Sequence, residues 1–128
     1  MLPDFNIVDN DVKEREESLK SEGIYKLLLS SKDAVERVNQ RICDDDEINR
    51  DRQIGHSYLL QIKTKNELIM AWQYNILPLL DEYCQGDCEK VNQILFEKDN
   101  SNWITEKDGI YNFKGDLTKL ENFISQIK

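Results

Sequence analysis

This sequence has few of the residues that usually build a catalytic or metal-binding site. It contains one histidine and has no GxxxxGK[ST] phosphate loop, no GxSxG elbow and no HExxH pair. Hydrolysis of a nucleoside triphosphate needs a phosphate loop and Mg²⁺ ligands, and acyl transfer needs an activated nucleophile. We therefore expect no catalytic residue and no metal site in this chain.

Cysteine is also scarce. The three thiols, Cys43, Cys84 and Cys88, give an odd count with no CxxC pair, which argues against a disulfide framework and a zinc site. Gly86 and Asp87 break the helical pattern between the last two, so we expect packing cysteines rather than a redox pair. This usage fits a reduced, cytoplasmic setting.

Positive charge is in deficit. The 17 Lys and Arg against 25 Asp and Glu give a net charge of −8, and no arginine follows Arg52. Phosphate neutralisation needs clustered basic side chains, so we expect no direct binding to DNA or to an anionic membrane surface. No apolar run approaches the roughly 18 to 20 residues of a membrane span, and the N-terminus lacks the order of a signal peptide. We expect a soluble cytoplasmic protein.

The length predicts a single domain over residues 1–128, mostly α-helical. Residues 1–29 form a lead-in and a variable helical segment. Within them, Phe5 to Val8 alternate weakly and predict a short edge strand or an extended stretch. Val12 to Lys20 are almost wholly charged, so any helix there is expected to be solvated, with Gly23 as its stop.

The next apolar pattern has helical spacing. A helix start is predicted at Ser30 or Ser31, followed by one apolar face made of Ala34, Val35, Val38 and Ile42. The acidic stretch CDDDEINRDRQ interrupts it. Carboxylates can hold a hard cation, but the spacing does not fit an EF-hand, and a solvated loop is the better interpretation.

A second long helix is predicted from Thr64. Thr64 and Glu67 have the capping-box spacing, in which each side chain can satisfy the other's free backbone N–H. Pro78 lies inside the run and predicts a kink or a restart near residues 75 to 77, and Gly86 ends the helix. The apolar stripe consists of Leu68, Ile69, Trp72, Ile76, Leu79, Leu80 and Tyr83.

The C-terminal third predicts a helix, a hairpin and another helix. Asp87 can cap a helix that ends near residues 98 to 101. A short β-hairpin is predicted from residues 103–105 and 110–113, with a turn at Asp108-Gly109. The last helix is expected to start at Asp116 or Thr118, and its inward face would contain Leu117, Leu120, Phe123, Ile124 and Ile127.

The stretch QIGHSYLL contains the most distinctive chemistry. His56 next to Ser57 could suggest nucleophilic catalysis, but adjacent residues rarely reach hydrogen-bond geometry, so a half-buried histidine with a structural hydrogen bond is favoured. We expect Gly55 to mark a tight turn or a close backbone approach. Trp72, Tyr74 and Tyr83 are expected in the core or at an interface.

In their order along the chain, several motifs resemble the lid of McrB-type AAA+ proteins, the GTP-hydrolysing motors of modification-dependent restriction systems. They are IGHSY at residues 54–58, the helix with Trp72, ILPLLDEY at 76–83 and Gly86-Asp87. VERVNQRI upstream resembles the first lid helix. Leu59 and Cys84 stand where the family pattern has aromatic residues.

The resemblance implies a lid-like helical region over residues 30–96. It does not extend to residues 97–128, where the hairpin and the terminal helix are predicted from the residue pattern alone. It implies a lid that closes over GTP or ATP with Mg²⁺ bound by a separate phosphate-loop core, and that contacts neighbouring subunits. Partners would be that AAA+ core domain, the ring neighbours and, through them, a McrC-like nuclease subunit. The nucleotide-proximal candidates are Arg50, Arg52, Gly55, His56 and Ser57; the core or interface candidates are Trp72, Tyr74, Ile76, Leu80 and Tyr83.

Two alternatives stay open beside a lid. One is a freestanding helical interaction module; an exposed apolar patch around Trp72 and Tyr74 would fit this module and the lid equally. The other is an independent hydrolase centred on His56, which is the least favoured because no third catalytic group is implied.

Overall fold

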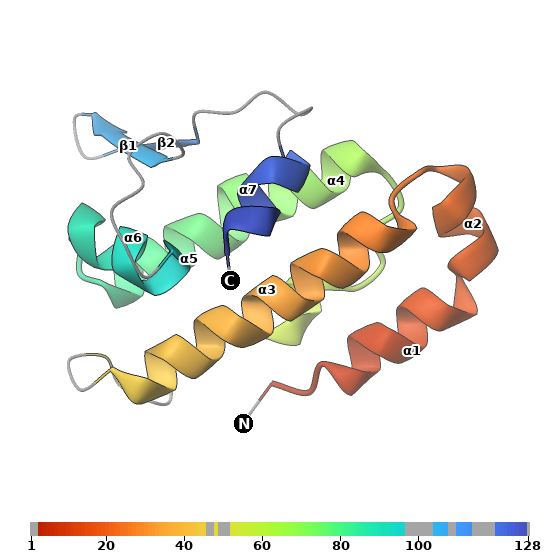
Figure 1. Cartoon of the computed structure of the whole chain (residues 1–128), viewed down its shortest axis with the longest axis horizontal. Helices are drawn as coiled ribbons and strands as arrows, with labels where there is room; N and C mark the ends of the chain where they lie inside the picture. The colour runs from red at the N-terminus through yellow and green to blue at the C-terminus, as the bar shows by residue number, and fades with distance from the viewer. Residues whose placement is uncertain are drawn as a thin grey trace.

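A computed structural model describes residues 3–45, 48, 52–96, 104–107, 110–113 and 120–127 of the chain. Its architecture is mostly α-helical, as predicted. One long helix, α3, runs through the middle, with α1 and α2 on one side of it and α4 to α7 on the other (Figure 1). The buried apolar side chains form a cluster that extends from Val8 in α1 to Ile127 after α7.

The N-terminal segment is helical, and the predicted edge strand over Phe5 to Val8 is wrong. Helix α1 (Asn6–Glu14) begins after Asp4, whose side chain accepts the Asn6 N–H at 3.1 Å, and α2 (Glu16–Ser21) follows directly. These helices are not solvated on every face, because Val8, Val12 and Leu19 are buried. The weak alternation was therefore the start of a 3.6-residue pattern. Gly23 does end the segment, with a φ of +76°.

Helix α3 spans Tyr25–Asp44 without interruption, so the predicted start at Ser30 or Ser31 is wrong. Ser31 does not cap a helix. It is fully buried, and its hydroxyl oxygen accepts the Trp72 Nε1–H at 3.1 Å. The predicted apolar face of residues 34 to 42 is buried as expected.

The second long helical run changes its winding twice. A 3-10 helix, η1 (His56–Leu59), precedes α4 (Lys65–Met70), a π-helix η2 (Ala71–Ile76) and α5 (Leu77–Tyr83). Pro78 lies at the start of α5, so the predicted restart is confirmed, and the wider π turn comes just before it. The helix run ends at Tyr83, and the turn that follows it includes Gly86, which has a φ of +78°.

The capping box at the start of α4 is formed in part. Thr64 Oγ1 accepts the Glu67 N–H at 3.1 Å, as predicted. The Glu67 carboxylate, however, accepts the N–H of Lys63 at 3.4 Å rather than that of Thr64. The cap therefore spans one residue more than the sequence spacing indicates.

Helix α6 (Cys88–Phe96) has a polar cap at each end. Asp87 Oδ1 accepts the N–H groups of Glu89 and Lys90 at 3.1 and 3.3 Å, as predicted. At the other end, the Arg41 guanidinium donates to the carbonyl oxygens of Ile94 and Leu95. A cation at the C-terminal carbonyls also suits the helix dipole, so α6 is fixed to α3.

Two short strands and a last helix follow. Strands β1 (Ile104–Lys107) and β2 (Ile110–Phe113) pair antiparallel in the register Ile104 with Phe113. The predicted turn at 108–109, the strand start at 103 and the predicted helix starts at 116 and 118 lie outside the described residues. Helix α7 spans Leu120–Gln126.

Helix α7 covers the indole of Trp72. The Phe123 ring makes edge-to-face contacts with Trp72 at 5.5 Å and with Phe96 at 5.7 Å between centroids. Trp72 is only 1% exposed, so it is not part of an exposed apolar patch. Tyr74 is 63% exposed and Met70 is 54% exposed, and these two lie four residues apart on the same helical run. None of the described helices is both long enough and apolar enough to cross a bilayer.

Candidate functional site

The first residue of the IGHSY segment (residues 54–58) is held by the buried side-chain amide of Asn39. Asn39 Oδ1 accepts the Ile54 N–H at 2.7 Å, and Asn39 Nδ2 donates to the Ile54 carbonyl oxygen at 2.9 Å. Asn39 is 4% exposed and Ile54 is fully buried. Both backbone groups of Ile54 are therefore satisfied by one side chain of α3, much as a neighbouring β-strand would satisfy them.

His56 is held by the start of the chain. The backbone N–H of Asp4 donates to His56 Nδ1 at 3.0 Å, and the Phe5 ring meets the imidazole edge to face at 6.4 Å between centroids. His56 is half-buried and Ser57 is exposed, and the two side chains make no hydrogen bond with each other. The structural interpretation of His56 is thus supported over a nucleophilic pair.

Residues just after the C-terminal end of the IGHSY segment are hydrogen-bonded to α1. Asp11 accepts the Gln61 N–H at 3.3 Å and forms two bonds with the Arg15 guanidinium, at 2.7 and 3.1 Å. Arg15 also donates to the Ile62 carbonyl oxygen at 2.8 Å. Burial raises the pKa of Asp11, but the Arg15 and Gln61 hydrogen bonds outweigh it and lower that pKa below its ordinary value.

Arg52 and Tyr83 lie close together at the N-terminal end of the IGHSY segment. The Arg52 guanidinium carbon lies 5.9 Å from the centroid of the Tyr83 ring, and the Tyr83 hydroxyl donates to the Gln53 carbonyl oxygen at 3.5 Å. Burial and the nearby Tyr58 and Glu82 raise the pKa of Tyr83, which keeps its hydroxyl a donor. Tyr83 is half-buried, so it lies between the core and the surface.

Arg52 differs from the other arginines that the structure describes. Arg15, Arg37 and Arg41 each donate to backbone carbonyl oxygens of another segment, and their charge is used to hold the fold. Arg52 is exposed and rests on an aromatic face. Arg50, the other arginine predicted near the nucleotide, lies outside the described residues.

Gly55 directly precedes the 3-10 turn of η1, but its backbone conformation does not require glycine. Its φ of −70° and ψ of 153° are open to any residue. A Cβ built at Gly55 would meet only Ser57 Oγ among the described atoms, at 3.8 Å, which is ordinary contact. The close backbone approach that was the other expectation finds no partner in the described part of this chain.

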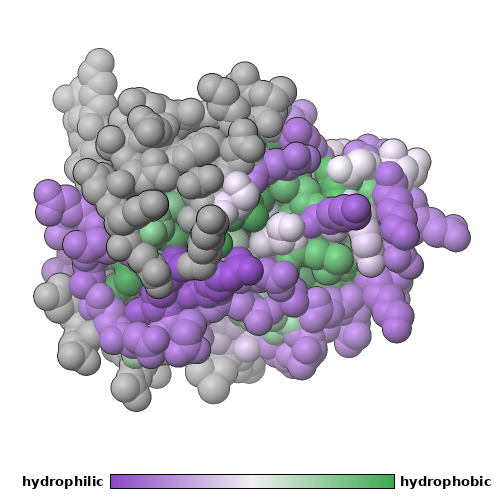
Figure 2. Space-filling view, in the orientation of Figure 1, coloured by the Kyte–Doolittle hydropathy of each residue, from purple (hydrophilic) through white to green (hydrophobic). Residues whose placement is uncertain are grey.

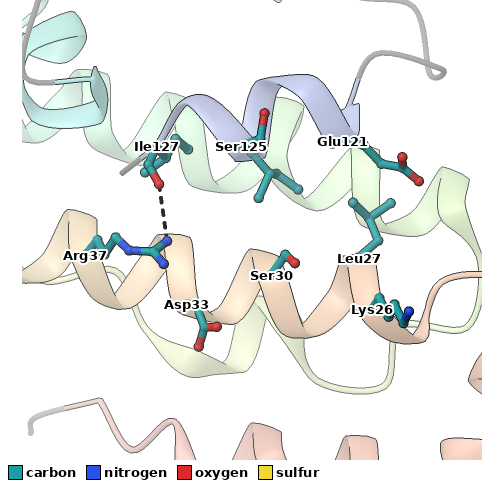
Figure 3. Close-up of a pocket in the computed structure, with 9 residues that line it drawn as sticks. Lys26, Leu27, Ser30, Asp33, Arg37, Glu121, Ser125 and Ile127 are labelled. Carbon is teal, nitrogen blue, oxygen red and sulfur yellow. Dashed lines mark hydrogen bonds between the residues drawn. The ribbon is translucent and has the colours of Figure 1, made fainter.

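One hollow lies away from the IGHSY segment. It has a volume of about 570 Å³ and lies between α3 and α7, where Arg37 donates to the Ile127 carbonyl oxygen at 3.2 Å (Figure 3). On the face of the molecule that is turned to the viewer in Figure 1, apolar surface areas are bordered by hydrophilic ones (Figure 2). None of the lining residues belongs to residues 52–58; they are Lys26, Leu27, Ser30, Asp33, Arg37, Glu121, Ile124, Ser125 and Ile127.

A smaller hollow of about 170 Å³ lies beside the IGHSY segment. Its lining combines the first described residues, Pro3 and Phe5, with Gln53 and one edge of α3. Within the described ranges, no group of three or more His, Cys, Asp or Glu is placed to hold a metal ion. Cys84 is buried and, because burial disfavours the thiolate, its pKa is raised to about 12, which supports a packing role.

Sequence reasoning identified the segment but not what holds it. Asn39 lies within VERVNQRI, the stretch that resembles the first lid helix. An amide beside the apolar face of Val35, Val38 and Ile42 could have signalled a buried hydrogen-bond partner. Asp4 had no comparable signal, because it bonds through its backbone. Arg52, Gly55, His56 and Ser57 do lie together on one continuous segment.

Residues 30–92 match the family model described as McrB, alpha-helical lid domain. This part of the chain is similar to the McrB lid family. The match covers just under half of the 128 residues and includes most of α3, the IGHSY segment, α4, η2 and α5. No curated protein matches the chain. The resemblance that the motifs predict is thus confirmed, and the lid associates the chain with a McrB-type AAA+ protein.

Proposed function

We propose that this chain acts as the lid of a McrB-like AAA+ nucleoside triphosphatase in a DNA restriction system. The IGHSY segment faces the bound GTP or ATP and its Mg²⁺, which are held by the AAA+ core, and the lid also contacts ring neighbours. A McrC-like nuclease subunit is engaged through the ring. The chain itself carries no catalytic residue.

The observation that supports this most is the unexplained glycine in a fixed segment. Asn39 holds Ile54 rigidly beside Gly55, yet neither backbone conformation nor a described neighbour requires glycine at position 55. A glycine that the fold does not need is suited to close approach by a group outside the chain. A nucleotide closed over by the lid is such a group.

The substitution Gly55→Ala tests this directly. At a φ of −70° alanine is unstrained and reduces the entropy of the unfolded chain, so the isolated chain is expected to be as stable as wild type or about 0.4–1 kcal/mol more stable. In an assembly of this chain with its AAA+ core, the same substitution is expected to lower nucleotide hydrolysis. Unchanged hydrolysis would show that nothing approaches Gly55.

A matched control is Gly86→Ala. Gly86 has a φ of +78°, which L side chains rarely adopt, so alanine there is expected to destabilise the isolated chain. The two substitutions should therefore have opposite effects. Gly55→Ala should lower nucleotide hydrolysis without destabilising the chain, whereas Gly86→Ala should destabilise the chain.

Arg52 is the proposed cation of the site, since the other described arginines are committed to carbonyl oxygens. Arg52→Gln is expected to weaken nucleotide binding by the assembly, and Arg52→Lys to restore only part of it, because lysine keeps the charge and loses the planar stacking on Tyr83. Arg37→Gln, which removes a structural arginine, serves as the control: its effect should appear in unfolding.

The freestanding interaction module is the second candidate, and the exposed Met70 and Tyr74 favour it. The mass of the native polypeptide in its source cells, detected with an antibody, separates the two. A product near 15.1 kDa would support the module, and the lid function would then require a partner core. A much heavier product that contains a phosphate loop would support the lid.

A further inference from the structure

We propose that residues 3–5 and His56 form a latch that fixes the imidazole as a hydrogen-bond donor at Nε2, toward an acceptor oxygen of the nucleotide. The position of residues 3–5 then sets whether the IGHSY segment can bind. This inference rests on the proposed function for the identity of the ligand. The latch itself stands on contacts within the chain.

The contacts that form the latch come from a segment outside the family match. The Asp4 N–H donates to His56 Nδ1 at 3.0 Å, across 52 positions of sequence, and the Phe5 ring packs on the edge of the same imidazole. Asp4 also caps the start of α1 through its side chain, so the backbone at position 4 is held in place. The imidazole is therefore fixed on two sides by residues that enter the fold before α1.

The direction of the hydrogen bond decides the chemistry of the ring. A neutral imidazole has one N–H and one acceptor nitrogen. Because Nδ1 accepts from Asp4, the proton lies on Nε2. Among the described residues, Nε2 has no hydrogen-bond partner, so the latched ring presents an N–H donor to a ligand. That donor suits a phosphate or ribose oxygen.

The other contacts that hold the IGHSY segment are stronger than the latch, so the latch is the contact that breaks most easily. At its other end the segment is held by Asp11 and Arg15 through charge-assisted bonds, and Asn39 holds Ile54 in the core. The bond between Asp4 and His56 is a single neutral hydrogen bond at the surface. A pull on residues 3–5 would break it first, and the ring would lose its fixed tautomer.

The chain has one histidine, so the ring signals in a ¹H–¹⁵N spectrum need no assignment. At a pH where the ring is neutral, we expect the Nε2–H tautomer in the wild-type chain. Asp4→Pro removes the N–H donor, and the ratio of Nε2–H to Nδ1–H is expected to fall roughly fivefold, the factor of one neutral hydrogen bond. A wild-type ring protonated on Nδ1, or an unchanged ratio in Asp4→Pro, would overturn the latch.

Two pairs of variants separate the latch from a general loss of structure. Asp4→Ala keeps the backbone N–H and should keep the wild-type tautomer ratio, unlike Asp4→Pro. His56→Asn places an oxygen near the position of Nδ1, so the Asp4 amide should stay protected from hydrogen exchange. His56→Ala should expose that amide roughly fivefold. Equal exchange in the two His56 variants would contradict the proposal.

Nucleotide binding by the assembly of this chain with the AAA+ core tests the second part of the proposal, that His56 Nε2 donates to the nucleotide. His56→Gln keeps a donor near the position of Nε2 and loses the latch, whereas His56→Asn keeps the latch and loses the donor. We expect both to bind nucleotide several-fold more weakly than wild type, and only His56→Asn to keep Asp4 protected. A correct tautomer result with unaffected binding in both would reject the ligand and the proposed function, and leave the latch.

Discussion

Loss of the Asn39 amide is expected to destabilise the fold more than any single surface substitution. In Asn39→Ala, the N–H and carbonyl oxygen of Ile54, which is fully buried, lose their partners. Each of these two buried groups costs about 1–3 kcal/mol when left without a partner, so the predicted loss is about 2–6 kcal/mol. A domain of this size typically has about 5–15 kcal/mol of stability, so much of it would be lost.

Urea unfolding followed by circular dichroism measures this loss as a lower midpoint at constant slope. Gln40→Ala is the matched control. It removes an amide from the next position, where the side chain is exposed and donates only to Asp44 at 3.2 Å, and it should change stability by less than about 0.5 kcal/mol. If Asn39→Ala costs under about 1 kcal/mol while the Ile54 amide stays protected from exchange, the reasoning is wrong.

Three further outcomes follow from the packing and the charges. Phe123→Ala should lower stability by about 3–5 kcal/mol in calorimetry, because the ring is fully buried against Trp72; a cost under 1 kcal/mol would mean that α7 does not complete the core. Asp87→Ala should cost about 1 kcal/mol in thermal unfolding and Asp87→Asn much less, since asparagine also caps; equal costs would argue against the cap. Because the pKa of Asp11 is lowered, its contribution is present above the ordinary value of 3.8 and is lost as pH falls through the lower folded value. Asp11→Asn should therefore flatten the acid side of a stability profile, and an unchanged profile would show that its pairing with Arg15 contributes nothing.

Local signals in the sequence predicted much of the helical framework correctly. The stop at Gly23, the cap at Thr64, the restart at Pro78 and the cap at Asp87 are each set within a few residues, by backbone geometry or by one side chain. Such features depend little on the rest of the chain. They could be predicted for that reason.

The errors share a different cause. Phe5 to Val8 read as a weak strand, and Ser31 read as a helix start, because short patterns of this kind are ambiguous without their neighbours. Packing on α3 decided both. Val8 is buried in a helix, and the Ser31 hydroxyl is used by Trp72 from 41 positions away.

For the candidate site, the sequence by itself determined the residues, and the tertiary structure decided their roles. The order of IGHSY, a tryptophan helix and PLLDEY was enough to indicate the lid family, since motif order is a property of the chain alone. Whether His56 is a nucleophile or a held ring, and whether Arg52 or Arg37 is committed to the fold, depended on partners far along the sequence. Hydrogen bonds of that kind are created by folding, because only the packed chain brings their two groups within about 3 Å.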